Sequence, residues 1–214
     1  MTTTRLFLIR HGETLANREM RYIGTRDDAL STTGEVQATQ LASVLTPLPI
    51  AAIYSSPLQR AHHTAEAIAT PHQLAVQVTP ELRECNFGVW EGLSRAEVLA
   101  QSVEDAARLH AWEQDATTAP PGGESFAAMQ QRVRTFVEQL AEQHAGQTLV
   151  LVSHVGPIKV LLAAALEAPL SASFRIFLDP ATISVVDWQA GGHALVRLVN
   201  SHAHMGWTEA RWMH

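Results

Sequence analysis

Two histidines occupy the same local setting at distant points of the chain. His11 comes shortly after the apolar run Leu6–Ile9, and His154 comes shortly after the run Thr148–Val152. Continuous apolar runs of this length are typical of strands buried on both faces of a sheet. Open α/β sheets bind their ligands beyond the C-terminal ends of the strands. We therefore expect the two imidazoles to face one another at one edge of a sheet.

Two arginines are candidates to join this histidine pair. Arg10 directly precedes His11, and Arg60 falls in the first turns of a helix predicted to follow the strand 51–54. A guanidinium presents a planar fork of donors that matches phosphate oxygens. Taken alone, Arg60 is more typical of a solvated helix face. If all four side chains converge, they form a pocket suited to a dianionic phosphoryl group.

Glu84 supplies a carboxyl group from a segment without helical period. Residues 81–92 are polar, with aromatic residues and glycines between them. Such loops bind ligands more often than they build the scaffold. The alternative for Glu84 is an ordinary loop carboxylate exposed to water.

The elements that must position these side chains alternate between strand and helix patterns. This alternation predicts a three-layer α/β/α fold with a mostly parallel central sheet and helices on both faces. Two helix starts are indicated by Thr32 with Glu35, a capping box, and by Ser56 with Pro57 at the first helical position. Strands are predicted at residues 6–9, 51–54, 76–78, 148–152, 182–188 and 194–199.

The chain is predicted to be a single domain over residues 1–214. Residues 94–124 carry no strand signal, and a capping box formed by Ser94 and Glu97 opens a helix there. We expect this segment to be a helical, lid-like insertion over the active site.

Composition limits the classes of partner. The formal net charge is −6 and there is no basic run, which disfavours nucleic acid and anionic membranes as partners. The single cysteine, Cys85, permits no intrachain disulfide and fits a reducing cytoplasm. No apolar stretch is long enough for a membrane span. A small phosphorylated metabolite is the expected partner, and a homodimer is compatible with this composition.

Five segments resemble, in order and in spacing, the motifs of the histidine phosphatase superfamily, which is also called phosphoglycerate-mutase-like. The resemblance covers roughly residues 6–206. An Arg-His-Gly triplet alone would be weak support, whereas the ordered set is specific. The segments are Arg10–Thr14 with Asn17, Ser55–Ala61 with Thr64 and Ala65, Glu81–Gly92, Pro121–Ser125 and Val152–His154.

The resemblance implies a role for each candidate residue. His11 would be the nucleophile that forms a phosphohistidine. Arg10, Arg60 and His154 would form the phosphate pocket, and Glu84 would donate and accept the proton. The family implies neither a metal ion nor a cofactor, because the cationic residues supply the positive charge.

Further residues would contact the substrate. By the same resemblance, Asn17 would contact the transferred phosphate and Gly24 would bring the backbone close to it. His204 is expected to line the pocket mouth, as in the phosphoserine-type members; the alternative is a surface histidine in a frayed tail. Four tryptophans could form an apolar leaving-group site or simply pack in the core; they are Trp90, Trp112, Trp207 and Trp212.

The resemblance leaves a choice between phosphatase and phosphoglycerate mutase. The mutases follow the proton-shuttling glutamate with a basic stretch and a long basic insertion. Here residues 85–120 contain no arginine or lysine besides Arg95 and Arg108. We therefore predict a phosphatase that hydrolyses a small-molecule phosphomonoester, such as phosphoserine, α-ribazole phosphate or a sugar phosphate. A mutase is the alternative, and a non-catalytic binding module ranks last because all the candidate catalytic residues are present.

Overall fold

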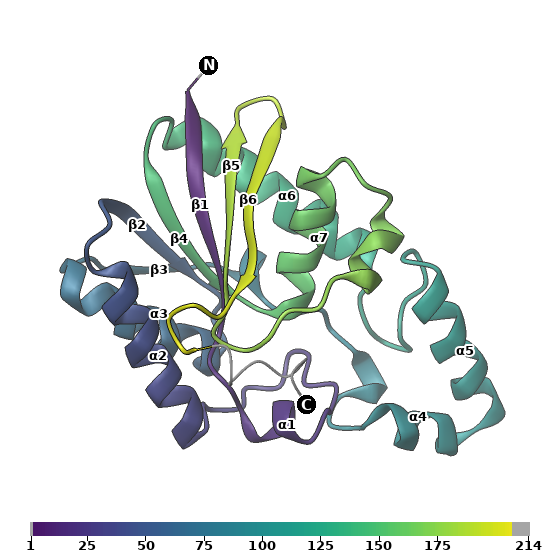
Figure 1. The fold of residues 1–214 in the computed structure, drawn as a ribbon. Helices are drawn as coiled ribbons and strands as arrows, with labels where there is room; N and C mark the ends of the chain where they lie inside the picture. The colour runs from purple at the N-terminus through teal and green to yellow at the C-terminus, as the bar shows by residue number, and fades with distance from the viewer. Residues whose placement is uncertain (1, 207–214) are drawn as a thin grey trace.

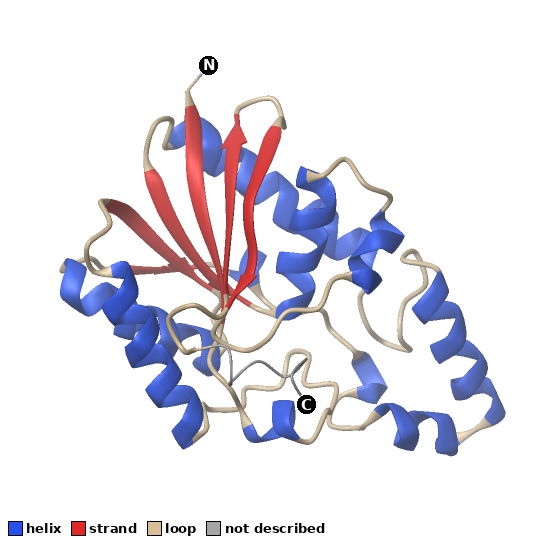
Figure 2. Cartoon of the chain, viewed as in Figure 1, coloured by secondary structure: helices blue, strands red, loops and turns tan. Residues whose placement is uncertain are grey.

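One six-stranded sheet forms the centre of the molecule. The computed structural model describes residues 2–206 of the 214-residue chain. The strand order is β3-β2-β4-β1-β5-β6, and the sheet appears in red in Figure 2. The strands are β1 (Thr3–Arg10), β2 (Ile50–Ser55), β3 (Val76–Val78), β4 (Thr148–Ser153), β5 (Ile183–Gln189) and β6 (Ala194–Ser201).

The sheet is mostly parallel, as predicted. Strands β1 to β4 run in one direction, β5 pairs antiparallel with β1, and β6 pairs antiparallel with β5. Helices α2 (Thr32–Leu45) and α3 (Gln59–His72) cover one face. Helices α6 (Phe126–Gln143) and α7 (Val155–Ala165) cover the other, so the molecule has the three predicted layers (Figure 1).

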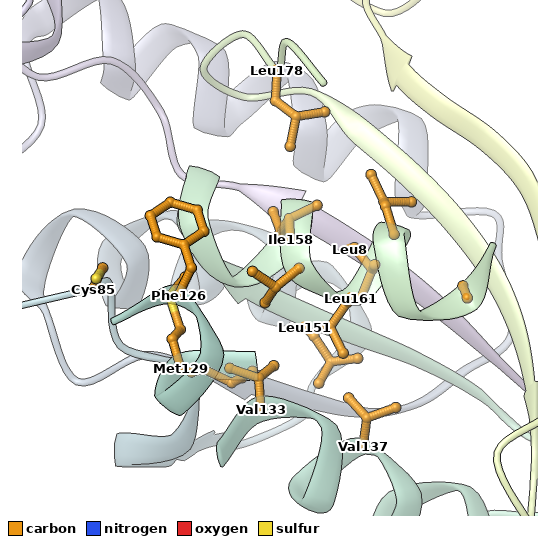
Figure 3. Packing of buried hydrophobic residues seen from close by; sticks show 14 of the residues in the cluster. Leu8, Cys85, Phe126, Met129, Val133, Val137, Leu151, Ile158, Leu161 and Leu178 are labelled. Carbon is orange, nitrogen blue, oxygen red and sulfur yellow. The ribbon is translucent and has the colours of Figure 1, made fainter. Parts of the chain in front are cut away.

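Because helices cover both faces of the sheet, its central strands are apolar at successive positions. Successive side chains of a strand point to opposite faces, so neighbours enter different cores. Leu8 packs in the core under α6 and α7, whereas Ile9 packs in the core under α2 and α3. Figure 3 shows Val133 and Val137 of α6 on the side of the helix that faces Leu151 of β4. A strand that is buried on both faces cannot alternate with polar residues.

The register of the sheet fixes where the site forms. Arg10 at the end of β1 pairs with Ser153 at the end of β4, and Ser55 at the end of β2 lies opposite Val152. The three parallel strands therefore end at one edge of the sheet. The residues that follow them meet there, as the sequence predicts for His11 and His154.

Two predicted helix starts differ from the structure. The cap of α2 is Ser31 rather than Thr32, and its hydroxyl accepts the N–H of Gly34. Helix α3 begins at Gln59 rather than near Ser56. The reason is a cap from a distant loop, because an Asp27 carboxylate oxygen accepts the N–H of Gln59 at 2.6 Å.

The segment 94–124 contains two helices and no strand. Helix α4 (Arg95–Gln101) starts with the predicted capping box, and α5 (Val103–Gln114) follows it away from the sheet (Figure 1). The remaining helices are α1 (Leu15–Arg18), the 3₁₀ helices η1 (Pro80–Leu82) and η2 (Gly88–Trp90), and η3 (Leu170–Arg175). Within residues 2–206, every helix is too short or too polar to traverse a lipid bilayer.

The central position of β1 makes its apolar residues critical for stability. We expect Leu6→Ala to lower the free energy of unfolding by about 2–5 kcal/mol, because Leu6 is 0% exposed and leaves a cavity. The matched control is Leu195→Ala on β6, where the side chain is 54% exposed and the loss should stay below about 0.5 kcal/mol. Urea denaturation measures both. Equal losses would contradict the assignment of β1 to the core.

Candidate active site

The structure brings the five predicted catalytic side chains to the edge of the sheet where β1, β2 and β4 end. Arg10 ends β1 and His11 follows it, while His154 is the N-cap of α7. The centroids of the two imidazole rings lie 5.0 Å apart. Arg60 comes from the first turn of α3, and Glu84 from the loop between η1 and η2. All five side chains are buried.

The hydrogen bonds of His11 define its tautomer. Its Nδ1 lies 2.7 Å from the carbonyl oxygen of Gly12, which can only accept, so Nδ1 carries the proton. The Nε–H of Arg60 points at Nε2 over 3.2 Å. Nε2 therefore bears the lone pair. The backbone N–H of Gly12 is in turn held by the Thr64 hydroxyl at 3.1 Å.

Both imidazoles are kept neutral by their surroundings. Burial lowers the pKa of His11 well below its ordinary value, and the cationic Arg60 and Arg10 lower it further. Burial is also the main cause that lowers the pKa of His154, followed by Arg60. A neutral imidazole with an unprotonated nitrogen is the nucleophilic form, and these surroundings hold His11 in that form at neutral pH.

The Arg60 guanidinium is fixed by the loop that contains Gly24. Its Nη2 donates to the Gly24 carbonyl at 2.8 Å, and its Nη1 donates to the Arg26 carbonyl at 2.6 Å. Gly24 has φ +57°, and a Cβ there would collide with the Glu91 carboxylate. Only glycine fits this position without strain. The sequence-predicted Gly24 thus contributes through its backbone, and it orients the arginine.

Arg10 is held by residues 178–182, the segment before β5. Its Nη1 donates to the Leu178 carbonyl at 2.6 Å. In the same segment the Ala181 N–H donates to the His11 carbonyl at 2.9 Å. Asp179 anchors this segment, because its Oδ2 lies 2.8 Å from Nε2 of His202 and both side chains are buried. Arg10 and the backbone of His11 are thus held by the same segment.

Glu84 is a buried carboxyl group that contacts the start of α7. Its Oε1 accepts the N–H of Cys85 at 2.9 Å and the N–H of Gly156 at 3.2 Å. Gly156 is required for this approach, because a Cβ there would collide with the carboxylate oxygen. Burial raises the pKa of Glu84, although these hydrogen bonds and Arg60 act against the rise. A raised pKa favours a carboxyl group that can give up a proton near neutral pH.

His154 is oriented by Ser56. The Ser56 hydroxyl accepts the N–H of Leu58 and lies 2.7 Å from Nε2 of His154, to which it can donate its own proton. His154 then carries its proton on Nδ1, an atom with no hydrogen-bond partner among the described residues. Ser56 is therefore a support for the site and not the helix cap that its position after β2 suggests.

The remaining predicted residues differ in their position. Asn17 lines the pocket, and its Oδ1 accepts the Thr14 N–H in the cap of α1. The structure does not bring His204 to the pocket; this side chain is partly buried near Ala181, so it does not line the mouth as expected. Trp112 lines the pocket and Trp90 packs in the core, whereas Trp207 and Trp212 lie outside the described residues.

The site opens into a pocket of about 420 Å³, within the range of small-molecule sites. Arg10, His11, Arg60 and Glu84 lie on its lining, together with several aromatic side chains. Among residues 2–206, no group of three or more histidine, cysteine or carboxylate side chains has the geometry of a metal site.

Several supporting residues escape detection from the sequence. Ser56, Thr64 and Asp179 carry no motif that points to His154, Gly12 or the 178–182 segment. Ser56 and Thr64 do fall inside the Ser55–Ala65 motif, which was the one available signal. Asp179 and His202 are 23 residues apart, and only the fold pairs them.

Comparison with known proteins agrees with this geometry. The model of the histidine phosphatase superfamily (branch 1) matches residues 6–201. The adenosylcobalamin/alpha-ribazole phosphatase of Escherichia coli is 36% identical over 93% of this chain and 97% of its own length. The solved structure of a mycobacterial glucosyl-3-phosphoglycerate phosphatase with VO3 has a TM-score of 0.83 and 34% identity, and it matches 92% of this chain and 98% of that one.

A further relative is longer than this chain. A bifunctional protein of Mycobacterium tuberculosis is 41% identical over 95% of the chain, which spans only 56% of that protein. The family expected from the five sequence segments is confirmed. Both of the other named relatives are phosphatases.

The two buried imidazoles make stability depend on pH. Their pKa values are lowered in the folded state from 6.5, so below about pH 6.5 the unfolded chain binds protons that the folded chain does not. Acidification must then lower the free energy of unfolding, by up to about 2.7 kcal/mol per pH unit for two groups. The double variant His11→Asn/His154→Asn should lack this acid-induced decrease in the free energy of unfolding. Urea denaturation between pH 7.5 and 5.5 measures it.

The matched control for that experiment is the double variant His110→Asn/His193→Asn, which removes two exposed histidines. It should keep the wild-type pH dependence. Glu84 is present in all three proteins, so its own titration cancels. An unchanged slope in His11→Asn/His154→Asn would contradict the neutral state of the pair.

Proposed function

The chain belongs to the histidine phosphatase superfamily, and we propose that it hydrolyses a small phosphomonoester through a phosphohistidine formed on His11. One observation carries this proposal. His11 holds its proton on Nδ1 against the Gly12 carbonyl and presents the Nε2 lone pair beside the Arg60 guanidinium. A phosphoryl group that takes over the Arg60 Nε–H would release that lone pair for attack on phosphorus.

The first step transfers the phosphoryl group to the enzyme. Nε2 of His11 attacks phosphorus, the N–P bond forms, and the P–O bond to the leaving group breaks. Glu84 gives its proton to the leaving oxygen, so the product departs as a neutral alcohol or phenol. The raised pKa of Glu84 supports this role, because the group must be protonated at this point.

The second step returns the enzyme to its starting state. The Glu84 carboxylate takes a proton from water as the water oxygen attacks phosphorus. The N–P bond then breaks and inorganic phosphate leaves, so Glu84 is protonated again and the Nε2 lone pair is restored. Splitting the hydrolysis into two displacements replaces one difficult step by two easier ones.

Fixed positive charge supports both steps. The transferred group spreads its charge over the equatorial oxygens, so donors held in place beforehand supply most of the stabilisation. Arg10 and Arg60 are each held by backbone carbonyls, and His154 offers an Nδ1–H without another partner among the described residues. Asn17 on the pocket lining is the proposed further contact to the phosphoryl group.

The arginines of residues 85–120 do not favour a mutase. A mutase must also grip the substrate carboxylate, and the two arginines between Cys85 and Pro120 are poorly placed for it. Arg95 forms an ion pair with Glu113 at 2.6 Å, and neither Arg95 nor Arg108 lines the pocket.

We also propose a small phosphorylated metabolite as substrate and the cytoplasm as the location. The pocket volume suits a metabolite, and the negative net charge does not favour a polyanion. Cys85 is a buried free thiol, which is compatible with a reducing compartment.

Trapping the intermediate tests the nucleophile. With a ³²P-labelled aryl phosphate and acid-free quenching, we expect label on wild-type protein in an acid-labile, alkali-stable bond, and none on His11→Ala. The variant His110→Ala, which removes an exposed histidine, should label like the wild type. Turnover should also survive chelator, because guanidinium groups supply the charge. Labelling of His11→Ala would contradict the proposal.

Glu84→Gln separates the two steps. With 4-nitrophenyl phosphate the leaving group needs no proton, so His11 should still be phosphorylated in one rapid burst. Water attack then lacks its base, and steady-state turnover should fall by about 10²- to 10⁴-fold. Stopped-flow absorbance records both phases. The control is Glu81→Gln in η1, three residues earlier, which should keep turnover close to wild type. A loss of the burst in Glu84→Gln would count against the assigned roles.

A further inference from the structure

The pocket extends from the catalytic residues to a wall of aromatic side chains. Tyr22, Phe87, Trp112, Phe126 and Phe174 all line it. Neighbouring rings touch, with centroids 5.2 Å apart for Tyr22 and Phe87, 5.5 Å for Trp112 and Phe126, and 4.9 Å for Phe126 and Phe174. We call these five residues the aromatic wall. All five pack with the hydrophobic core, and together they form the apolar side of the pocket.

The aromatic wall is built by segments outside the sheet. Trp112 comes from α5 in the 94–124 segment, Phe126 opens α6, and Phe174 lies in η3. Trp112 is central, because its ring also contacts those of Tyr22 at 5.9 Å and Phe174 at 5.7 Å. Rings that are already packed against one another lose little freedom on binding and present an apolar surface.

One cation lies in this otherwise apolar part of the pocket without a partner. Lys159 on α7 lines the pocket and is partly buried, and it forms no hydrogen bond or ion pair with residues 2–206. Arg21 also lines the pocket, but it is paired with Glu19 at 2.7 Å and with Glu97 at 2.8 Å. Arg60, within the catalytic group, is held by carbonyls.

Lys159 lies on the leaving-group side of the site. Gly156, three residues earlier on α7, donates its N–H to Glu84, and residues three apart share one face of a helix. Glu84 is the group that protonates the leaving oxygen, so it marks where the leaving group begins. Burial is the first cause that lowers the pKa of Lys159 and Arg10 is the second, while Glu84 acts the other way.

A partly buried ammonium that forms no ion pair or hydrogen bond is unfavourable. The phosphoryl group already has Arg10, Arg60 and His154 around it. Lys159 is thus free to pair with an anionic group on the remainder of the substrate.

Resting on the proposed function, we infer that the substrate's leaving group combines an apolar part with a second anionic group. The aromatic wall would receive the apolar part, and the Lys159 ammonium would pair with the anion, which can be a carboxylate or a further phosphate. Lys159 is thereby a specificity-determining residue. Small neutral alcohols would leave both features unused.

A matched pair of substrates tests this inference. Phenyl phosphate and 4-carboxyphenyl phosphate differ only by the carboxylate on the ring. The ratio of kcat/KM for the carboxylated over the plain substrate should fall by about tenfold in Lys159→Met, which keeps the apolar stem, since a charged hydrogen bond is worth about 1.5–3 kcal/mol. Lys159→Arg should recover most of the ratio. An effect of the substitution on folding or on Glu84 acts on both substrates alike, so it cancels from the ratio.

The control is Arg175→Met, which removes an exposed cation next to Phe174 of the aromatic wall. It should leave the ratio unchanged. An unchanged ratio in Lys159→Met, or an equal fall in Arg175→Met, would overturn the inference. Either result would leave the proposed function intact, whereas absence of a phosphohistidine in the wild type with both substrates would overturn the proposed function itself.

The aromatic wall has its own measurement. Trp112→Leu should raise KM for phenyl phosphate relative to methyl phosphate by about fivefold or more, because part of the apolar contact is lost. A thermal melt of Trp112→Leu checks that the variant is folded. If KM for the two substrates rises by the same factor, the aromatic wall does not receive the leaving group.

Discussion

The Arg60 guanidinium must stay charged while it is only 1% exposed, and the site is organised around this constraint. A buried cation is tolerated only where its donors are satisfied. Here the Gly24 and Arg26 carbonyls take two of them, and the lone pair of His11 Nε2 takes a third. Burial lowers the pKa of His11, and the Arg60 charge lowers it further, so the proposed nucleophile stays neutral. In the proposed mechanism, the Arg60 charge would thus serve both phosphate binding and the neutral state of His11.

The sheet makes this arrangement stable because it delivers the pieces from three parallel strand ends. Arg10 and Ser153 are paired in register, so His11 and His154 emerge side by side. The supports come from elsewhere. The 178–182 segment holds both Arg10 and the His11 backbone, while Ser56 after β2 orients His154. A site held by so many segments depends on complete folding, because no single element contains enough of it to form alone.

The two halves of the pocket have different origins. The cationic half belongs to the sheet edge and to the starts of α3 and α7. The aromatic wall comes from α5, η3, the start of α6 and the loops that hold Tyr22 and Phe87, all of which lie outside the sheet. Chemistry and choice of leaving group can therefore vary separately. A change at Trp112 would alter which substrate fits without moving His11.

The sequence by itself determined the layers, the mostly parallel sheet and the five catalytic candidates, because buried strands and the residues just after them leave a local signal. It misjudged the starts of α2 and α3, and it placed His204 at the pocket. The sequence does not reveal that Asp27 caps α3, that Ser56 serves His154, or that Lys159 lacks a partner. These are contacts between residues far apart in the chain, and only tertiary packing decides which polar groups meet and which stay unpaired.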